Sequence, residues 1–217
     1  MLVGNRMTSP CITISPETPV GDALAQMKKD KVRRYPVVDK HGKLVGIVSL
    51  SDLLNAQPSE ATTLSVWEIN YLLSKITVER VMAKEVITVT EDTPIEEAAR
   101  IMADHKIGGL PVVRGDSVMG IITETNLFKV FLEQLGARTS GVRITLLVKD
   151  VPGKLVDITS AIHRVKGNLI SVTTFLGETS TDRTITLKVN GASLEALRAA
   201  VEPLAEKVVD IREMHVG

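Results

Sequence analysis

The heptapeptide GIVSLSD at residues 46–52 decides how this chain can be interpreted. It continues an apolar segment predicted to be a buried strand over residues 44–48, and it leads into a helix predicted to begin near Ser51. It brings together a glycine that lets a ligand approach the backbone, two hydroxyl side chains and one carboxylate. These groups suit the phosphate and ribose hydroxyls of a nucleotide. A serine or aspartate before a helix also commonly serves only as its N-cap, so the heptapeptide alone leaves both interpretations open.

The heptapeptide recurs as GIITETN at residues 120–126, within a repeat that covers most of the first 135 residues. Pro36 aligns with Pro111 at an offset of 75 residues. Gly46 aligns with Gly120 at an offset of 74, after a turn that is one residue shorter in the second copy. A repeat that keeps its register over this length indicates two copies of one structural unit.

The composition excludes several classes of protein. The 217 residues are 44% hydrophobic but only 3% aromatic, so the cores must be aliphatic, and the length suits two or three small domains. The 26 basic and 26 acidic residues cancel, which argues against nucleic acid or an anionic membrane as a partner. A single cysteine, Cys11, excludes an internal disulfide, and no metal-ligand cluster, signal-like start or membrane-length apolar run is visible. We therefore expect a soluble, cytoplasmic protein without a metal site.

Each copy is predicted to form a short strand, a helix, a hairpin and a second helix. In the first copy we expect a strand at 11–15, a helix capped by Thr18 that ends near residue 31, and hairpin strands at 37–38 and 44–48. In the second copy we expect a strand at 87–90, a helix capped by Thr93 with Glu96 three residues later, hairpin strands at 111–113 and 118–122, and a helix at 125–135. The helical spacing of apolar residues such as Ala23 and Met27 predicts one buried face.

The rest of the chain follows two other patterns. Between the copies we predict a loop at 58–63 and a helix at 65–74, whose Trp67 and Tyr71 either stack on a base or pack in a core or dimer interface. A polar stretch at 136–141 is the predicted linker. Beyond it, strands at 142–148, 169–175, 184–189 and 208–214 alternate with helices at 153–165 and 193–204. This βαββαβ order predicts a ferredoxin-like antiparallel sheet with two helices on one face.

Residues 1 to about 135 resemble a pair of CBS domains, through GIVSLSD, the Val37-Val38-Asp39 segment and their second copies. Residues from about 141 to 217, which include VKDVPGKL at 148–155, resemble an ACT domain. The order CBS, CBS, ACT is similar to that of acetoin utilisation proteins of the AcuB type. The implied fold class is α+β / α/β, with two βαββα repeats and one βαββαβ domain. The implied boundaries are repeat 1 at 1–57, an inter-repeat segment at 58–78, repeat 2 at 79–135, a linker at 136–141 and the ACT domain at 142–217.

The resemblance implies an adenine nucleotide (AMP, ADP or ATP) in a cleft between the two copies. In CBS pairs the aspartate that ends the glycine-hydroxyl motif holds the ribose, and here it is Asp52. Arg33 and Arg34 match positions that contact phosphate, although they can equally be a solvated basic pair at a helix end. The other implied contacts come from the motif itself and from the adenine lining of the second copy, and they are Gly46, Ser49, Ser51, Thr88, Ile107 and Gly108.

The second copy departs from this pattern. Asn126 replaces the aspartate, and Gly108 and Gly109 stand where the first copy has Arg33 and Arg34. An amide bonds a hydroxyl without the charge or the paired oxygens of a carboxylate. We therefore predict one good site, at Asp52, and a second site that is weak or vacant, at Thr123, Thr125 and Asn126. The two threonines can also act only as a helix cap.

In the ACT-like part, the resemblance implies an amino acid as ligand. It would be held by the loop before the first helix and by the residue that opens the second strand of a neighbouring subunit. The matching residues are Asp150, Gly153 and Asn168. Val148 stands where some amino-acid-binding members carry a histidine, which disfavours a polar ligand of that type. Gly153 and Asn168 can also serve only the turns that they occupy.

Three functions follow from these features. A regulatory sensor would bind an adenine nucleotide at Asp52 and an amino acid at the ACT interface, and would signal to a target protein through domain packing, with the helix at 65–74 and the Gly136 linker as moving parts. An ATP-using enzyme is disfavoured, and no catalytic residue is predicted, because the sequence shows no nucleophile-base pair and no second carboxylate that pairs with Asp52. A self-associating scaffold with vestigial clefts is the alternative. Both domain types commonly self-associate, so we expect a homodimer.

Overall fold

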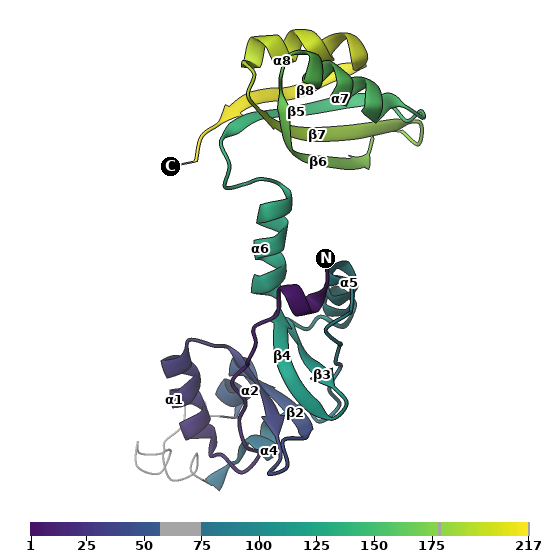
Figure 1. Ribbon diagram of the computed structural model, residues 1–217. Helices are drawn as coiled ribbons and strands as arrows, with labels where there is room; N and C mark the ends of the chain where they lie inside the picture. The colour runs from purple at the N-terminus through teal and green to yellow at the C-terminus, as the bar shows by residue number, and fades with distance from the viewer. Residues whose placement is uncertain (57–74, 178, 217) are drawn as a thin grey trace. The chain divides into compact units, whose positions relative to one another are not determined.

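A computed structural model describes residues 1–56, 75–177 and 179–216. The chain forms two compact units, Met1–Leu127 and Phe128–Gly217, whose elements are labelled in Figure 1. The predicted helix at 65–74, with Trp67 and Tyr71, lies outside the described residues.

The first unit contains two copies of one arrangement, as the repeat predicts. Strands β1 and β2 pair antiparallel, as do β3 and β4, with a register shift at the equivalent place in each hairpin. Both predicted hairpins are therefore confirmed. The elements in chain order are η1 (Val3–Asn5), α1 (Val20–Asp30), β1 (Arg34–Val38), β2 (Leu44–Ser49), α2 (Leu50–Asn55), α4 (Val78–Val81), α5 (Ile95–His105), β3 (Gly109–Arg114) and β4 (Ser117–Thr123). They are followed by α6 (Glu124–Gln134), which begins in the first unit and ends in the second.

The strands predicted at 11–15 and 87–90 are reduced to single bridges. Ile14 forms a parallel bridge with Val37, and Val89 forms the equivalent bridge with Val112. The Ile14 N–H donates to the Pro36 carbonyl and its own carbonyl accepts from Val38 N–H, at 3.1 and 3.0 Å. Each segment therefore pairs with the edge strand of its hairpin through a single residue.

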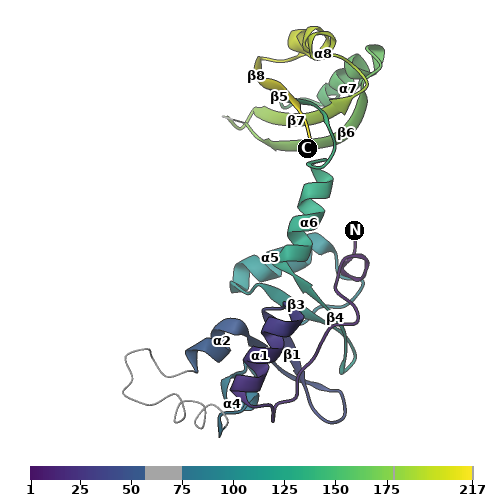
Figure 2. The same cartoon turned by 90° about the vertical axis from the view of Figure 1, so that its left-hand side faces the viewer.

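The two repeats exchange their leading segments. Val3, at the N-terminus, is fully buried in the core of the second repeat, and Val78 is fully buried in the core of the first. Backbone hydrogen bonds fix both exchanges, with Val3 N–H donating to Thr93 and Val78 N–H donating to Thr18, each at 2.9 Å. Figure 2 shows the N-terminal segment running beside the second repeat. The predicted boundaries at 1–57 and 79–135 follow the sequence repeat, whereas each core takes one fully buried residue from outside its own range.

The same exchange explains why two predicted helix caps are wrong. Helices α1 and α5 begin after Pro19 and Pro94, and neither Thr18 nor Thr93 caps them with its side chain. Backbone carbonyls from the exchanged segments take over this role. Val20 N–H donates to the Ile76 carbonyl at 2.9 Å and Ile95 N–H donates to the Met1 carbonyl at 3.1 Å, so the first N–H group of each helix is satisfied without a hydroxyl.

The two cores are built from equivalent positions. They are aliphatic except for Tyr35, and the buried faces of α1 and α5 show the predicted helical spacing. The first core contains Ile14, Val20, Ala23, Met27, Tyr35, Val37, Val48, Leu53 and Val78. The second contains Val3, Val89, Ala98, Met102, Leu110, Val112 and Ile122.

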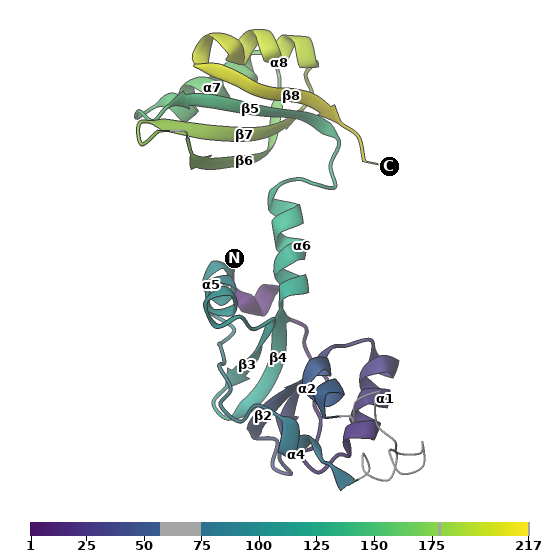
Figure 3. The ribbon, with the colours of Figure 1, turned by 180° about the vertical axis from the view of Figure 1, so that it is seen from behind.

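The second unit has the predicted βαββαβ fold. Its sheet is antiparallel in the order β6-β7-β5-β8. Figure 1 shows α7 and α8 along one side of the sheet, and Figure 3 shows the strands from behind. The elements are β5 (Gly141–Lys149), α7 (Lys154–Arg164), β6 (Asn168–Leu176), β7 (Asp182–Asn190), α8 (Leu194–Val201), η2 (Glu202–Leu204) and β8 (Lys207–Met214).

Gly136, expected to begin a flexible linker, is packed against the sheet of the second unit. Its carbonyl accepts a 2.8 Å hydrogen bond from the buried Lys188 ammonium, and the preceding carbonyl of Leu135 accepts one from Ser171. Gly136 has φ +59°, and a Cβ atom there would lie 2.4 Å from Ile170 Cγ2. The end of α6 is therefore packed on this sheet, and the role of Gly136 as a moving part stays a prediction.

Candidate functional site

Asp52 and Ser49 form a reciprocal cap at the start of α2. One oxygen of Asp52, Oδ2, accepts hydrogen bonds from the Ser49 N–H at 2.8 Å and from the Ser49 hydroxyl at 2.6 Å. The Ser49 hydroxyl in turn accepts from Asp52 N–H at 3.3 Å. The N-cap interpretation of this motif is thus confirmed. It leaves the second carboxylate oxygen, Oδ1, without a hydrogen bond from any described residue.

Asn126 makes the same cap in the second repeat and uses its remaining polar atom as well. Its Oδ1 accepts from the Thr123 N–H at 3.0 Å and from the Thr123 hydroxyl at 2.6 Å. Its Nδ2 donates to the Arg6 carbonyl at 3.0 Å. A carboxylate has no hydrogen to donate to this carbonyl, which explains the amide at this position. Every polar group of the Asn126 side chain therefore has a structural partner.

A cleft of about 390 Å³ lies at Asp52, with a polar side from the first repeat and a largely apolar side from the second. Six of the predicted site residues line it, namely Arg34, Ser49, Ser51, Asp52, Ile107 and Gly108. The other lining residues were not predicted as ligand contacts, and they are Ile47, Ala83, Glu85, Val86, Ile87, Lys106 and Gly109.

Three predicted contacts, Arg33, Gly46 and Thr88, do not line this Asp52 cleft. Gly46 is buried, and a Cβ atom there would lie 2.4 Å from the Met82 sulfur and 3.1 Å from the Ala83 carbonyl oxygen. The glycine therefore permits close packing of the hairpin on the segment that contains Met82 and Ala83. Ile87 lines the cleft in place of Thr88, because neighbouring side chains of an extended segment point in opposite directions.

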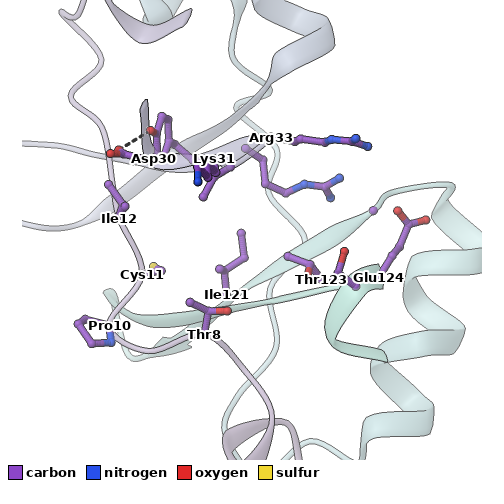
Figure 4. Close-up of a pocket in the computed structure, with 15 residues that line it drawn as sticks. Thr8, Pro10, Cys11, Ile12, Asp30, Lys31, Arg33, Ile121, Thr123 and Glu124 are labelled. Atoms are coloured by element: carbon purple, nitrogen blue, oxygen red, sulfur yellow. Dashed lines mark hydrogen bonds between the residues drawn. The ribbon is translucent and has the colours of Figure 1, made fainter. Parts of the chain in front are cut away.

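A second cleft, of about 660 Å³, lies at Thr123. Figure 4 shows Arg33 on one side of it and Thr123 with Glu124 on the other. Thr125 lines this Thr123 cleft as predicted, whereas Asn126 does not. The remaining lining residues are Thr8, Pro10, Cys11, Ile12, Asp30, Lys31, Val32, Arg34, Tyr35, Gly108 and Ile121.

The sequence predicts Arg33 in the same site as Asp52, and the structure separates the two. Each cleft combines the hydroxyl motif of one repeat with the strand entrance of the other. Gly108 stands at the position equivalent to Arg33 and lines the Asp52 cleft as well as the Thr123 cleft. Arg33 accordingly lies in the Thr123 cleft, because the two repeats face each other with approximate two-fold symmetry.

Arg34 lines both clefts. Burial lowers the pKa of its guanidinium, and Arg33 acts in the same direction, whereas attraction to Glu124 and to Asp52 acts in the opposite direction. The guanidinium stays protonated at any physiological pH. It is therefore a half-buried permanent cation between two carboxylates.

Other charged groups distinguish the clefts. Lys31 in the Thr123 cleft and Lys106 in the Asp52 cleft both occupy left-handed positions at helix ends, with φ +55°. Asp30 accepts a 2.7 Å hydrogen bond from the Tyr35 hydroxyl, and burial together with this bond raises the pKa of Tyr35. Burial also raises the pKa of the Cys11 thiol.

The predicted ACT ligand residues lie at two ends of the second unit. Asp150 lines a shallow cleft of about 310 Å³ and pairs with Arg183 at 2.8 Å. Gly153, with φ +86°, precedes α7, and apart from its chain neighbours no described residue comes within 4 Å of where its Cβ atom would lie. Asn168 opens β6 and donates to Asn190, which is seven residues along β7 from Arg183 and so roughly 23 Å away. One chain therefore does not bring Asp150 and Asn168 together.

Two further properties limit the chemistry of the described residues. They contain no group of three or more His, Cys, Asp or Glu side chains that could hold a metal ion. None of their helices has the length and hydropathy needed to cross a membrane.

The sequence matches two domain families. Residues 3–59 and 78–133 match the CBS domain, and residues 140–212 match the TTHA0829-like ACT domain. A curated relative, L-aspartate semialdehyde sulfurtransferase of Methanocaldococcus jannaschii, is 31% identical over 131 residues, which is 60% of this chain but 23% of the enzyme. The chloroplastic CBS domain-containing protein CBSX2 of Arabidopsis thaliana is 33% identical over 138 residues, or 55% of this chain and 58% of that protein. The chain thus spans less than two thirds of either relative.

Solved structures of CBS pairs resemble the first unit. A putative acetoin utilization protein (AcuB) from Vibrio cholerae is 32% identical with a TM-score of 0.53, covering 63% of this chain and 93% of that one. CBSX2 in complex with AMP is 35% identical with a TM-score of 0.51, covering 60% and 96%. The CBS pair of protein MJ0100, in complex with 5′-methylthioadenosine and S-adenosyl-L-methionine, is 32% identical with a TM-score of 0.51, covering 60% and 95%.

Proposed function

This chain belongs to the CBS domain family and carries an ACT domain after its CBS pair, and we propose on that basis that it is a non-catalytic regulatory protein that binds an adenine nucleotide in the Asp52 cleft. The ligand is AMP, ADP or ATP. Related CBS pairs have been solved with AMP and with adenosine-containing thioether and sulfonium ligands, which supports an adenosine group as the common element.

The observation that carries this proposal is that Asp52 lines a cleft of suitable size while its Oδ1 accepts no hydrogen bond from the described residues. Oδ2 is engaged in the cap, so Oδ1 remains to accept a hydrogen bond from a ribose hydroxyl. The apolar residues contributed by the second repeat, such as Ile87 and Ile107, offer a surface for the adenine ring. Arg34 and Lys106 supply positive charge for the phosphate. A volume of about 390 Å³ falls within the usual range for small-molecule sites.

Isothermal titration calorimetry with AMP, ADP and ATP tests the proposal. We expect at least one of them to bind with a dissociation constant below about 1 mM, since a single well-placed set of charged hydrogen bonds and a stacked base suffice for that affinity. Mass spectrometry of any small molecule that copurifies with the protein identifies the natural ligand. Failure of all three nucleotides to bind at millimolar concentration would refute the nucleotide-sensor proposal and favour a self-associating scaffold.

The non-catalytic part of the proposal has its own test. The relative that is a sulfurtransferase extends far beyond the matched region, so its activity does not transfer to this chain. We expect no ATP turnover by the purified protein. Turnover that persists through repeated purification and is lost in Asp52→Asn would show that the chain is an enzyme.

For the ACT domain we propose a small amino acid as ligand, bound at Asp150 and Gly153 of one subunit and Asn168 of another, in a homodimer. The Asp150–Arg183 pair supports this, because its two charges match the ammonium and carboxylate of an amino acid. We expect one of the common amino acids to raise the thermal midpoint of the protein, and Asp150→Ala to remove that shift. Asp157→Ala, in the first turn of α7 and outside the cleft, should retain it. If no amino acid shifts the midpoint or the sedimentation coefficient, this domain serves only self-association.

A further inference from the structure

The side chain of Arg34 occupies the boundary between the two clefts of the CBS pair. A Cβ atom on Gly108 would lie 2.5 Å from its Nη2, and one on Gly109 would lie 2.8 Å from its Nη1. Its guanidinium therefore rests directly on the backbone of these two glycines. Gly109 is the residue equivalent to Arg34 in the second repeat, so Arg34 touches its own counterpart and lies close to the two-fold axis of the pair.

The glycines at 108 and 109 follow from this position of Arg34. A side chain at either position would overlap the guanidinium, because atoms closer than about 3 Å to a Cβ must move. A second arginine there would also place two buried cations side by side. Loss of the arginine pair from the second repeat thus makes room for Arg34, and the two clefts share one central cation.

Two carboxylates compete for this cation. Attraction to Glu124, in the Thr123 cleft, and to Asp52, in the other, both stabilise the charged guanidinium. A phosphate group carries about 1.5 to 2 negative charges at neutral pH. A phosphate in either cleft would draw on the single charge of Arg34 and would repel a second phosphate beside the same guanidinium.

The two clefts differ in how much phosphate binding in each depends on Arg34. Without it, the Asp52 cleft keeps Lys106 as its cation, against the carboxylates of Asp52 and Glu85. The Thr123 cleft keeps both Lys31 and Arg33, against Glu124 and the Asp30 that is bonded to Tyr35. A phosphate-bearing ligand in the Asp52 cleft therefore relies on Arg34 more strongly.

We propose that Arg34 is a single phosphate-binding group shared by the two clefts, so that binding of one phosphate-bearing adenine nucleotide in the Asp52 cleft weakens binding of a second in the Thr123 cleft. An adenosine ligand without a phosphate does not need the charge of Arg34. Its binding in one cleft therefore does not weaken its binding in the other. The inference rests on the proposed nucleotide function of the Asp52 cleft. It adds which ligands can occupy both clefts at the same time.

Calorimetric titrations of the full chain with AMP and with 5′-methylthioadenosine, an uncharged probe, test the inference. The measured quantity is the ratio of the second to the first dissociation constant. We expect this ratio to be at least about tenfold larger for AMP than for the uncharged probe. In Arg34→Met the first AMP dissociation constant should rise while the second changes little, so the AMP ratio falls toward that of the uncharged probe. In wild-type protein, added salt should lower the ratio of the second to the first dissociation constant for AMP. It should leave the same ratio for 5′-methylthioadenosine unchanged.

Arg33→Met is the matched control. Arg33 lines only the Thr123 cleft, so its loss should weaken the second AMP step and raise the ratio, the opposite of the effect of Arg34→Met. Equal weakening of both AMP steps in Arg34→Met, or equal wild-type ratios for the two probes, would overturn the shared role and leave the proposed function intact. The salt series on wild-type protein decides the same question if Arg34→Met does not fold. Absence of binding by either probe would overturn both the inference and the proposed function.

Discussion

Asp52→Asn is expected to weaken binding of AMP in the Asp52 cleft by about ten- to a hundredfold, because a hydrogen bond to a charged group contributes about 1.5–3 kcal/mol. The same change should leave the thermal midpoint nearly unaltered. The second repeat supplies the reason, since Asn126 makes with Thr123 the same two hydrogen bonds that Asp52 makes with Ser49. Calorimetry and thermal unfolding on the same preparation therefore separate the loss of a ligand contact from the loss of a cap.

Asn126→Ala is the control for this experiment. It removes the equivalent cap, together with the bond to the Arg6 carbonyl, and should cost about 1–2 kcal/mol of stability. The first dissociation constant for AMP should nevertheless stay within about twofold of the wild-type value. Equal losses of affinity in Asp52→Asn and Asn126→Ala would contradict the assignment of the ribose contact to Asp52.

Val3→Asp is expected to destabilise the first unit by at least about 3–5 kcal/mol, because it places an unpaired charge in an apolar core. Val3 is fully buried among Val89, Leu110, Ile122 and their neighbours, although it is the third residue of the chain. Urea denaturation measures the loss. Hydrogen exchange should show that α5 loses protection, since the N-terminal segment caps that helix through the Met1 carbonyl.

Leu2→Asp is the control for Val3→Asp. The adjacent Leu2 side chain is 43% exposed, so a carboxylate there stays in water and should cost less than about 0.5 kcal/mol. A cost near 1 kcal/mol for Val3→Asp would mean that the N-terminal segment detaches from the second repeat without disrupting it. That result would contradict a core closed by exchanged segments.

The sequence predicted the fold well because its strongest signals are local and periodic. The spacing of Ala23 and Met27, and of Ala98 and Met102, places each helix against a core, and the two hairpins follow their apolar runs. Family resemblance then supplied the CBS and ACT folds. The caps at Thr18 and Thr93 were predicted wrongly because the carbonyls that replace them come from segments more than fifty residues away.

The site was predicted less completely, since it depends on how one repeat faces the other. Ser49, Ser51 and Asp52 lie together because they are neighbours in the chain. Arg33 and Asp52 lie in different clefts because of the way the two repeats pack on each other. Local sequence patterns do not predict that packing. One signal was available, because Gly108-Gly109 in place of two arginines marks a close approach by another group.

The exchange of leading segments also affects how the chain folds during synthesis. The first repeat lacks Val78, one of its core residues, until well after α2, which ends at Asn55, has been made. At about 5–20 residues per second, the 23 residues from 55 to 78 take roughly one to five seconds to add. During that interval the apolar faces of α1 and the first hairpin are not yet covered by Val78. Dividing the chain between the repeats would give two fragments that each lack a core valine, so we expect the two repeats to fold together as one unit.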